Sequence, residues 1–91
     1  MADRDLLFEK DALEELKDWI AIDKKLATRI IELCEQSLKD PFRGIGKPEP
    51  LKYFRQGYWS RRINKEHRLV YKVTESAIIV ISCKFHYSKR T

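Results

Sequence analysis

The sequence predicts an α+β fold in which two N-terminal helices pack on one face of a small, mostly antiparallel sheet, in the order β-α-α-β-β-β-β. Two observations lead to this prediction. Apolar residues recur every three or four positions in the first half, as on a helix face, and alternate with polar residues in the second half, as in strands. Because 91 residues support only one modest core, residues 1–91 are expected to form a single domain.

The N-terminal segment predicts a strand followed by a helix. Leu6–Phe8 is a short apolar run that fits a first strand. Asp11 stands three residues before Glu14, a spacing typical of a capping box, and predicts a helix from Asp11 to about Ala21.

A second helix and an ordered loop follow. Asp23 can cap a helix whose apolar stripe extends to Lys39. All three prolines and two of the three glycines lie within Pro41–Pro50, which predicts a loop. Phe42 and Ile45 are expected to anchor this loop to the core.

The second half predicts four strands in an antiparallel meander, with the last and most apolar strand expected at the centre of the sheet. These strands are Leu51–Phe54, Tyr58–Ile63, His67–Thr74 and Ala77–Phe85. Alternation along each strand divides its side chains between two faces. The odd-numbered apolar residues are expected to face the helices, including Ile79, Ile81, Cys83 and Phe85. The opposite, open face should then carry Arg62, Arg68, Lys84 and His86, joined by Lys52.

Composition narrows the class of protein. No apolar stretch is long enough to span a membrane and the N-terminus does not resemble a signal peptide, so a cytoplasmic location is expected. Cys34 and Cys83 lack metal-ligand spacing and are expected to be reduced core thiols, with no metal or cofactor. The charge is uneven, with Lys and Arg concentrated after residue 46, which favours binding to a polyanion.

One carboxylate stands among these cations. Glu49 lies between Pro48 and Pro50, and it could act as a general base on a ribose 2′-OH. His86 could protonate the departing 5′ oxygen, while Arg68 and Arg62 stabilise the phosphate charge. Each residue also has a simpler interpretation, since Glu49 could merely pair with a lysine and His86 could be an ordinary surface histidine. Arg61 and Arg62 could be solvated edge charges, and His67 is expected to be structural or an RNA contact.

Longer motifs resemble the YoeB/Txe family of toxins from type II toxin–antitoxin modules, within the RelE-like superfamily. The motifs are KPEPLK at Lys47–Lys52, GYWSRRI at Gly57–Ile63, EHRLVY at Glu66–Tyr71 and FHY at Phe85–Tyr87. The resemblance implies a ribosome-dependent mRNA endoribonuclease that cuts the A-site codon without a metal. It also implies that Glu49 is the general base, His86 the general acid and Arg68 the phosphate-stabilising residue. The expected supporting or RNA-binding residues are Lys47, Lys52, Arg61, Arg62, Lys84 and Tyr87.

The resemblance further implies partners. A cognate antitoxin of the YefM/Axe type, with an acidic C-terminal segment, would neutralise the toxin, and the toxin would form homodimers and toxin–antitoxin hetero-oligomers. Its targets would be the ribosome and mRNA, with no membrane partner. Two alternatives stay open, namely a non-catalytic RNA- or ribosome-binding module and a corepressor that uses the same basic face. The residues Ser88–Thr91 extend past the usual family ending and have no assigned role.

Overall fold

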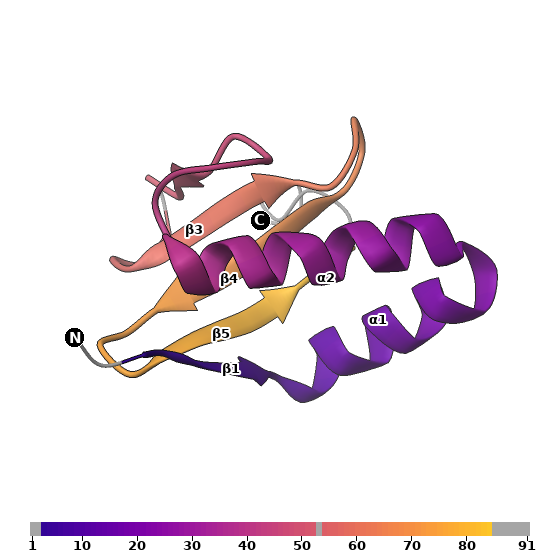
Figure 1. Cartoon of the computed structure of the whole chain (residues 1–91), viewed down its shortest axis with the longest axis horizontal. Helices are drawn as coiled ribbons and strands as arrows, with labels where there is room; N and C mark the ends of the chain where they lie inside the picture. The colour runs from indigo at the N-terminus through magenta and orange to yellow at the C-terminus, as the bar shows by residue number, and fades with distance from the viewer. Residues whose placement is uncertain (1–2, 53, 85–91) are drawn as a thin grey trace.

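The computed structural model describes residues 3–52 and 54–84. Five strands form one sheet in the order β1-β5-β4-β3-β2. The strands are β1 (Asp5–Phe8), β2 (Glu49–Pro50), β3 (Tyr58–Arg62), β4 (Arg68–Val73) and β5 (Ala77–Ser82). Strands β2 to β5 make the antiparallel meander that the sequence predicts, whereas β1 pairs with β5 in parallel (Figure 1).

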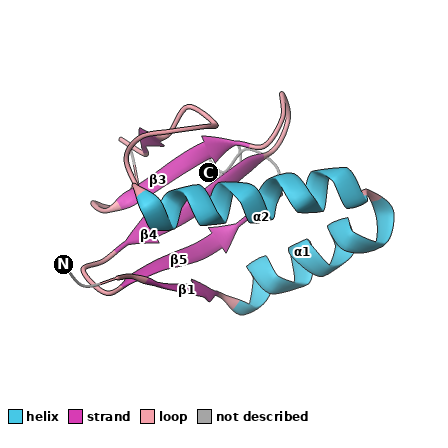
Figure 2. Cartoon of the chain, viewed as in Figure 1, coloured by secondary structure: helices cyan, strands magenta, loops and turns pink. Residues whose placement is uncertain are grey.

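The helices α1 (Lys10–Ile22) and α2 (Lys24–Lys39) lie side by side against the sheet, which confirms the predicted fold class (Figure 2). Asp23 caps α2 as expected, since its carboxylate accepts a hydrogen bond of 3.1 Å from the Leu26 amide. The prediction that Asp11 caps the first helix is wrong, because α1 begins at Lys10 and Asp11 lies in its first turn. There its charge favours the positive end of the helix dipole. No helix among the described residues is long and apolar enough to cross a bilayer.

The core lies between the helices and the sheet. Ile30 and Leu33 of α2 are fully buried against Leu69 and Tyr71 of β4, with twelve buried residues in this cluster. Cys34 and Cys83 are both buried and unbridged, which confirms the expectation of core thiols. Burial raises the pKa of each thiol to about 12, with a smaller contribution from a nearby carboxylate in each case.

Two predicted strands differ from those observed. The strand expected at Leu51–Phe54 is wrong, since the strand observed here is the two-residue β2, which ends at Pro50. The Leu51 amide makes one more hydrogen bond, to the carbonyl of Tyr58, and the chain then turns back toward β3. The central strand is β4 rather than β5, since β1 adds to the outer side of β5.

The expected facing of β5 is also partly wrong. Ile78, Val80 and Cys83 belong to the core cluster, whereas Ile79 and Ile81 are half-buried and lie outside it. Val70 pairs with Ser82 while Tyr71 pairs with Val80, so the register shifts by one residue at this point. A β-bulge of this kind resets the alternation, which strict alternation from the sequence does not anticipate.

Candidate active site

Three cross-strand rows define the open face of the sheet. Glu49 pairs with Ser60, and Ser60 with Val70, so these side chains share one face. Leu69 and Tyr71, which alternate with Val70, belong to the core cluster on the helix side. The Glu49 row is therefore on the face of the sheet away from the helices, where Glu49 is exposed and Ser60 and Val70 are buried.

Cations lie in the next row along the sheet. Arg62 of β3 pairs directly with Arg68 of β4, two residues from Ser60 and Val70. Burial lowers the pKa of Arg68, as does the charge of Arg62, while the charge of Glu49 raises it. The carboxylate and the two guanidinium groups therefore lie close enough to influence one another. This arrangement places one carboxylate beside two guanidinium groups.

The backbone fixes Arg68 and Glu49 in different ways. The Nη1 group of Arg68 donates to the Asn64 carbonyl at 2.8 Å and to the His67 carbonyl at 3.1 Å, so the β3–β4 turn holds the guanidinium. Glu49 is exposed but lies in β2, between two prolines that restrict its backbone. Lys47, just before this strand, adopts a positive φ of 48°.

Arg61 corrects one sequence prediction, because it is fully buried and is not available as a surface ligand for RNA or as a solvated edge charge. Its guanidinium donates to the carbonyls of Ile45 at 2.8 Å, Asp40 at 2.6 Å and Arg43 at 2.9 Å. Its Nε donates to the Tyr71 hydroxyl, which donates to the Pro41 carbonyl at 2.7 Å.

These bonds give Arg61 a structural function that the sequence analysis missed. They hold the loop between α2 and β2, the segment that leads into Glu49, against strands β3 and β4. The Arg62 amide adds a further hydrogen bond of 2.6 Å to the carbonyl of Gly46. One signal was present in the sequence, since Arg61 alternates with Trp59 and Ile63 and therefore shares their core-facing side.

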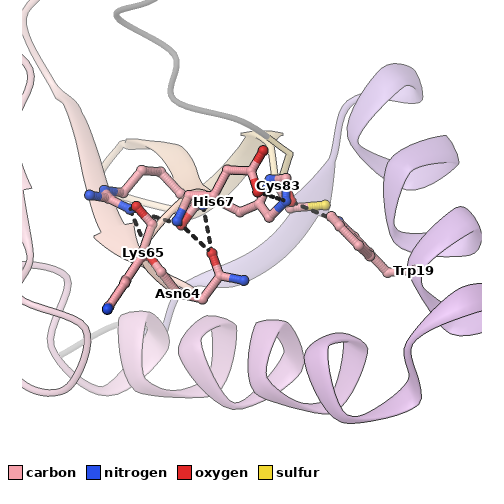
Figure 3. A network of polar contacts seen from close by, with 7 residues as sticks. Trp19, Asn64, Lys65, His67 and Cys83 are labelled. Atoms are coloured by element: carbon pink, nitrogen blue, oxygen red, sulfur yellow. Dashed lines mark hydrogen bonds and ion pairs between the residues drawn. The ribbon is translucent and has the colours of Figure 1, made fainter.

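Lys84 and His67 lie on the side of α1. The Lys84 ammonium is 5.9 Å from the ring centroid of Trp19, so the expectation that Lys84 faces the open side is wrong. The His67 ring is buried edge-on against Trp19, with 4.7 Å between centroids, and its Nε2 is 3.7 Å from a carboxylate oxygen of Glu66 (Figure 3). His67 is therefore a packing residue, in keeping with the structural alternative.

The remaining predicted residues divide into two groups. Lys47 and Lys52 are exposed on either side of Glu49 in the chain and add positive charge near it. His86 and Tyr87 lie outside the described residues. Among residues 3–52 and 54–84, no group of three or more His, Cys, Asp or Glu side chains could hold a metal ion.

Solved structures with similar folds define the class of protein. The chain has a TM-score of 0.87 and 45% identity to the YoeB dimer from Staphylococcus aureus, covering 94% of this chain and 100% of that one. It has a TM-score of 0.82 and 44% identity to a YoeB–YefM complex from the same organism, covering 94% and 100%. These structures belong to a class of small toxins that bacteria encode.

The family follows from the sequence comparisons. The chain belongs to the YoeB-like toxins of bacterial type II toxin–antitoxin systems, whose family model matches residues 8–87. Toxin YoeB of Mycobacterium bovis is 46% identical over 84 residues, which is 92% of this chain and 99% of that protein. The resemblance recognised in the sequence motifs is thereby confirmed.

Proposed function

We propose that this toxin is a ribosome-dependent mRNA endoribonuclease that cuts the codon in the A site and so stops translation. The observation that carries the proposal is the placement of Glu49 on the open face beside the Arg62–Arg68 pair. A base next to two phosphate ligands is what cleavage by the ribose 2′-OH requires. A purely phosphate-binding surface would gain nothing from a carboxylate there, because it repels the ligand.

The reaction is an internal transphosphorylation. Glu49 takes the proton of the 2′-OH, and the 2′ oxygen forms a bond to the adjacent phosphorus. The bond between phosphorus and the 5′ oxygen then breaks, and the departing oxygen takes a proton from His86. Arg68 and Arg62 stabilise the negative charge on the phosphorane oxygens. The products are a 2′,3′-cyclic phosphate and a 5′-hydroxyl end.

Other residues support binding of the RNA. Lys47 and Lys52 are exposed near Glu49 and can contact neighbouring phosphates. Tyr87 is proposed to support the active site next to His86, as its motif position implies. Arg61 and Lys84 are not included, since the first is buried and the second lies over Trp19.

We extend the proposal to partners. The S. aureus relatives are a YoeB dimer and a complex of YoeB with YefM, so a homodimer and a YefM-like antitoxin are proposed here. An acidic antitoxin segment would be attracted to the same cationic face and compete with RNA. Action on ribosomes requires a cytoplasmic location.

Cleavage on programmed ribosomes tests the proposal. The toxin is mixed with ribosomes that hold a defined A-site codon, and new 5′ ends are mapped by primer extension. Glu49→Gln and His86→Ala should each lower the single-turnover rate by at least about 100-fold. Glu75→Gln is the matched control, because Glu75 is an exposed carboxylate in the distant β4–β5 turn.

Three outcomes separate the alternatives. Ribosome-dependent cutting that needs both Glu49 and His86 supports the nuclease. Sedimentation with ribosomes without cutting would favour a non-catalytic binding module. Activity that survives Glu49→Gln unchanged would reject Glu49 as the base even if cutting occurs.

A further inference from the structure

A pocket lies at the β2 edge of the sheet, and its lining begins at Pro50, the residue that follows Glu49. It has a volume of about 430 Å³ and is lined by residues that follow Glu49 in the chain and by the start of β3. Its walls include Pro50, Leu51, Lys52, Phe54, Tyr58 and Trp59. Pockets of this size accommodate small planar ligands. The proposed chemistry above does not use this pocket.

The pocket presents aromatic rings to solvent. Phe54 is 38% exposed, and its ring meets that of Tyr58 edge-on with 4.6 Å between the centroids. An exposed phenylalanine beside a half-buried tyrosine offers a surface on which a nucleobase can stack, and such stacking tolerates any base. Rings buried in the core could not serve this purpose.

Cations surround these rings. The Lys72 ammonium lies 5.6 Å from the centroid of the Tyr58 ring. Lys52 and Arg55 also line or flank the pocket and are exposed. Aromatic rings interleaved with cations match the two components of a nucleotide, the flat base and the charged phosphate. The charge therefore favours a nucleotide over an uncharged aromatic ligand.

The strand register shows where Tyr58, a residue of this pocket, lies relative to Glu49 and the arginine pair. Tyr58 pairs with Lys72, Ser60 pairs with Glu49 and Val70, and Arg62 pairs with Arg68. These are successive rows on the open face, separated by about 6.6 Å because side chains on one face alternate along a strand. Glu49 is thus in the middle row, with the arginine pair on one side and the Tyr58–Lys72 row on the other.

We infer that this pocket, formed around Phe54 and Tyr58, binds the nucleobase of the nucleotide on the 5′ side of the cut. The inference rests on the proposed function, in which Glu49 faces the 2′-OH of that nucleotide and the arginine pair faces the phosphate on its 3′ side. The base of the same nucleotide then extends away from the arginine pair, toward the pocket. Stacking there would hold the ribose with its 2′ oxygen against Glu49.

Removal of the base provides the test. Ribosomes are programmed with an intact codon or with one whose nucleotide 5′ of the cut is abasic, and single-turnover cleavage is measured for both. For the wild type, loss of the base should slow cleavage by about 10- to 100-fold, the range expected for one stacked base. Phe54→Leu and Tyr58→Leu should slow cleavage of the intact codon by about tenfold and leave the abasic codon nearly unaffected.

Controls separate stacking from folding. Leu7→Ala is the control, because Leu7 is an exposed apolar residue of β1, at the edge of the sheet opposite β2, and does not line the pocket. It should slow both codons equally or not at all, and thermal unfolding identifies any variant that is not folded. If Phe54→Leu and Tyr58→Leu slow the intact and abasic codons by the same factor, the inference is wrong.

A binding measurement distinguishes failure of this inference from failure of the proposed function. The Glu49→Gln variant is bound to ribosomes with 2-aminopurine at the same nucleotide, and stacking is read as quenched fluorescence. Quenching that disappears with Phe54→Leu supports the pocket even if no cleavage is found. Normal cleavage by the wild type without quenching would overturn the inference about the pocket and leave the proposed nuclease activity intact.

Discussion

The Nε group of Arg61 donates a hydrogen bond of 3.1 Å to the hydroxyl of Tyr71 in the interior of the protein. Through this pair, adjacent strands β3 and β4 together bind the carbonyls of the loop that precedes Glu49. The described residues contain no buried side-chain nitrogen or oxygen without a hydrogen-bond partner. The hydrogen-bond partners of the buried Arg61 guanidinium are therefore three backbone carbonyls and one hydroxyl, and no carboxylate is among them.

Arg61→Met should destabilise the protein strongly, because it leaves several loop carbonyls and the Tyr71 hydroxyl without their donor. We expect the free energy of unfolding to fall by about 2–5 kcal/mol, with each orphaned group costing about 1–3 kcal/mol. Urea denaturation measures this change. Arg62→Met, next in the chain but exposed, should change stability by no more than about 0.5 kcal/mol. Equal losses for both variants would contradict the structural role of Arg61.

Gly46→Ala should be more harmful than Gly57→Ala. Both glycines have a positive φ, 82° and 90°, so each alanine meets a backbone penalty of about 1–2 kcal/mol. A Cβ on Gly46 would also lie 2.9 Å from a Leu33 methyl and 3.2 Å from the Arg62 carbonyl, whereas one on Gly57 meets only the Val73 carbonyl at 3.5 Å. Thermal unfolding should show a larger decrease for Gly46→Ala. The reverse order would mean that the loop can move away from β3.

The buried thiols predict a loss of stability in alkaline solution. The pKa of Cys34 is raised from 9.0 to about 12 by burial and by Glu35, so the folded state keeps a proton that the unfolded chain releases. This contribution is fully present below pH 9 and is lost between pH 9 and about 12, at up to about 1.4 kcal/mol per pH unit for each thiol. Cys34→Ala should reduce the slope of unfolding free energy against pH over that range. An unchanged slope would show that the thiol is accessible.

Salt should weaken ribosome binding if the arginine row contacts phosphates. A plot of log affinity against log salt concentration should be steep for the wild type, and Arg62→Ala should reduce its slope by about one. Lys24→Ala, an exposed cation at the start of α2, serves as the control and should leave the slope unchanged. Sedimentation with ribosomes at several salt concentrations measures both. If the affinity of the wild type for ribosomes does not change with salt concentration, phosphate contacts are not the basis of binding.

Much of the architecture could be predicted from local patterns. The apolar periodicity of residues 24–39, the cap at Asp23 and the stop at Pro41 act over a few residues, so the second helix was predicted almost to its ends. The meander from residue 49 onward follows from short connections between neighbouring strands. The motifs around Glu49 and Arg68 likewise identified the family before any geometry was known.

What sequence alone could not supply depends on contacts between distant segments. The bulge that turns Ile78 and Val80 into the core arises from pairing with β4, not from β5 itself. The carbonyls that surround Arg61 come from residues 16 or more positions away in the chain. The charge of Arg61 therefore suggested an exposed side chain, whereas hydrogen bonds to these distant carbonyls make its burial favourable. By itself the sequence determined the elements, the family and the identity of the candidate base. Only the tertiary structure decided that Glu49 lies between an arginine row and an aromatic row, because strand register is set by pairing across the sheet.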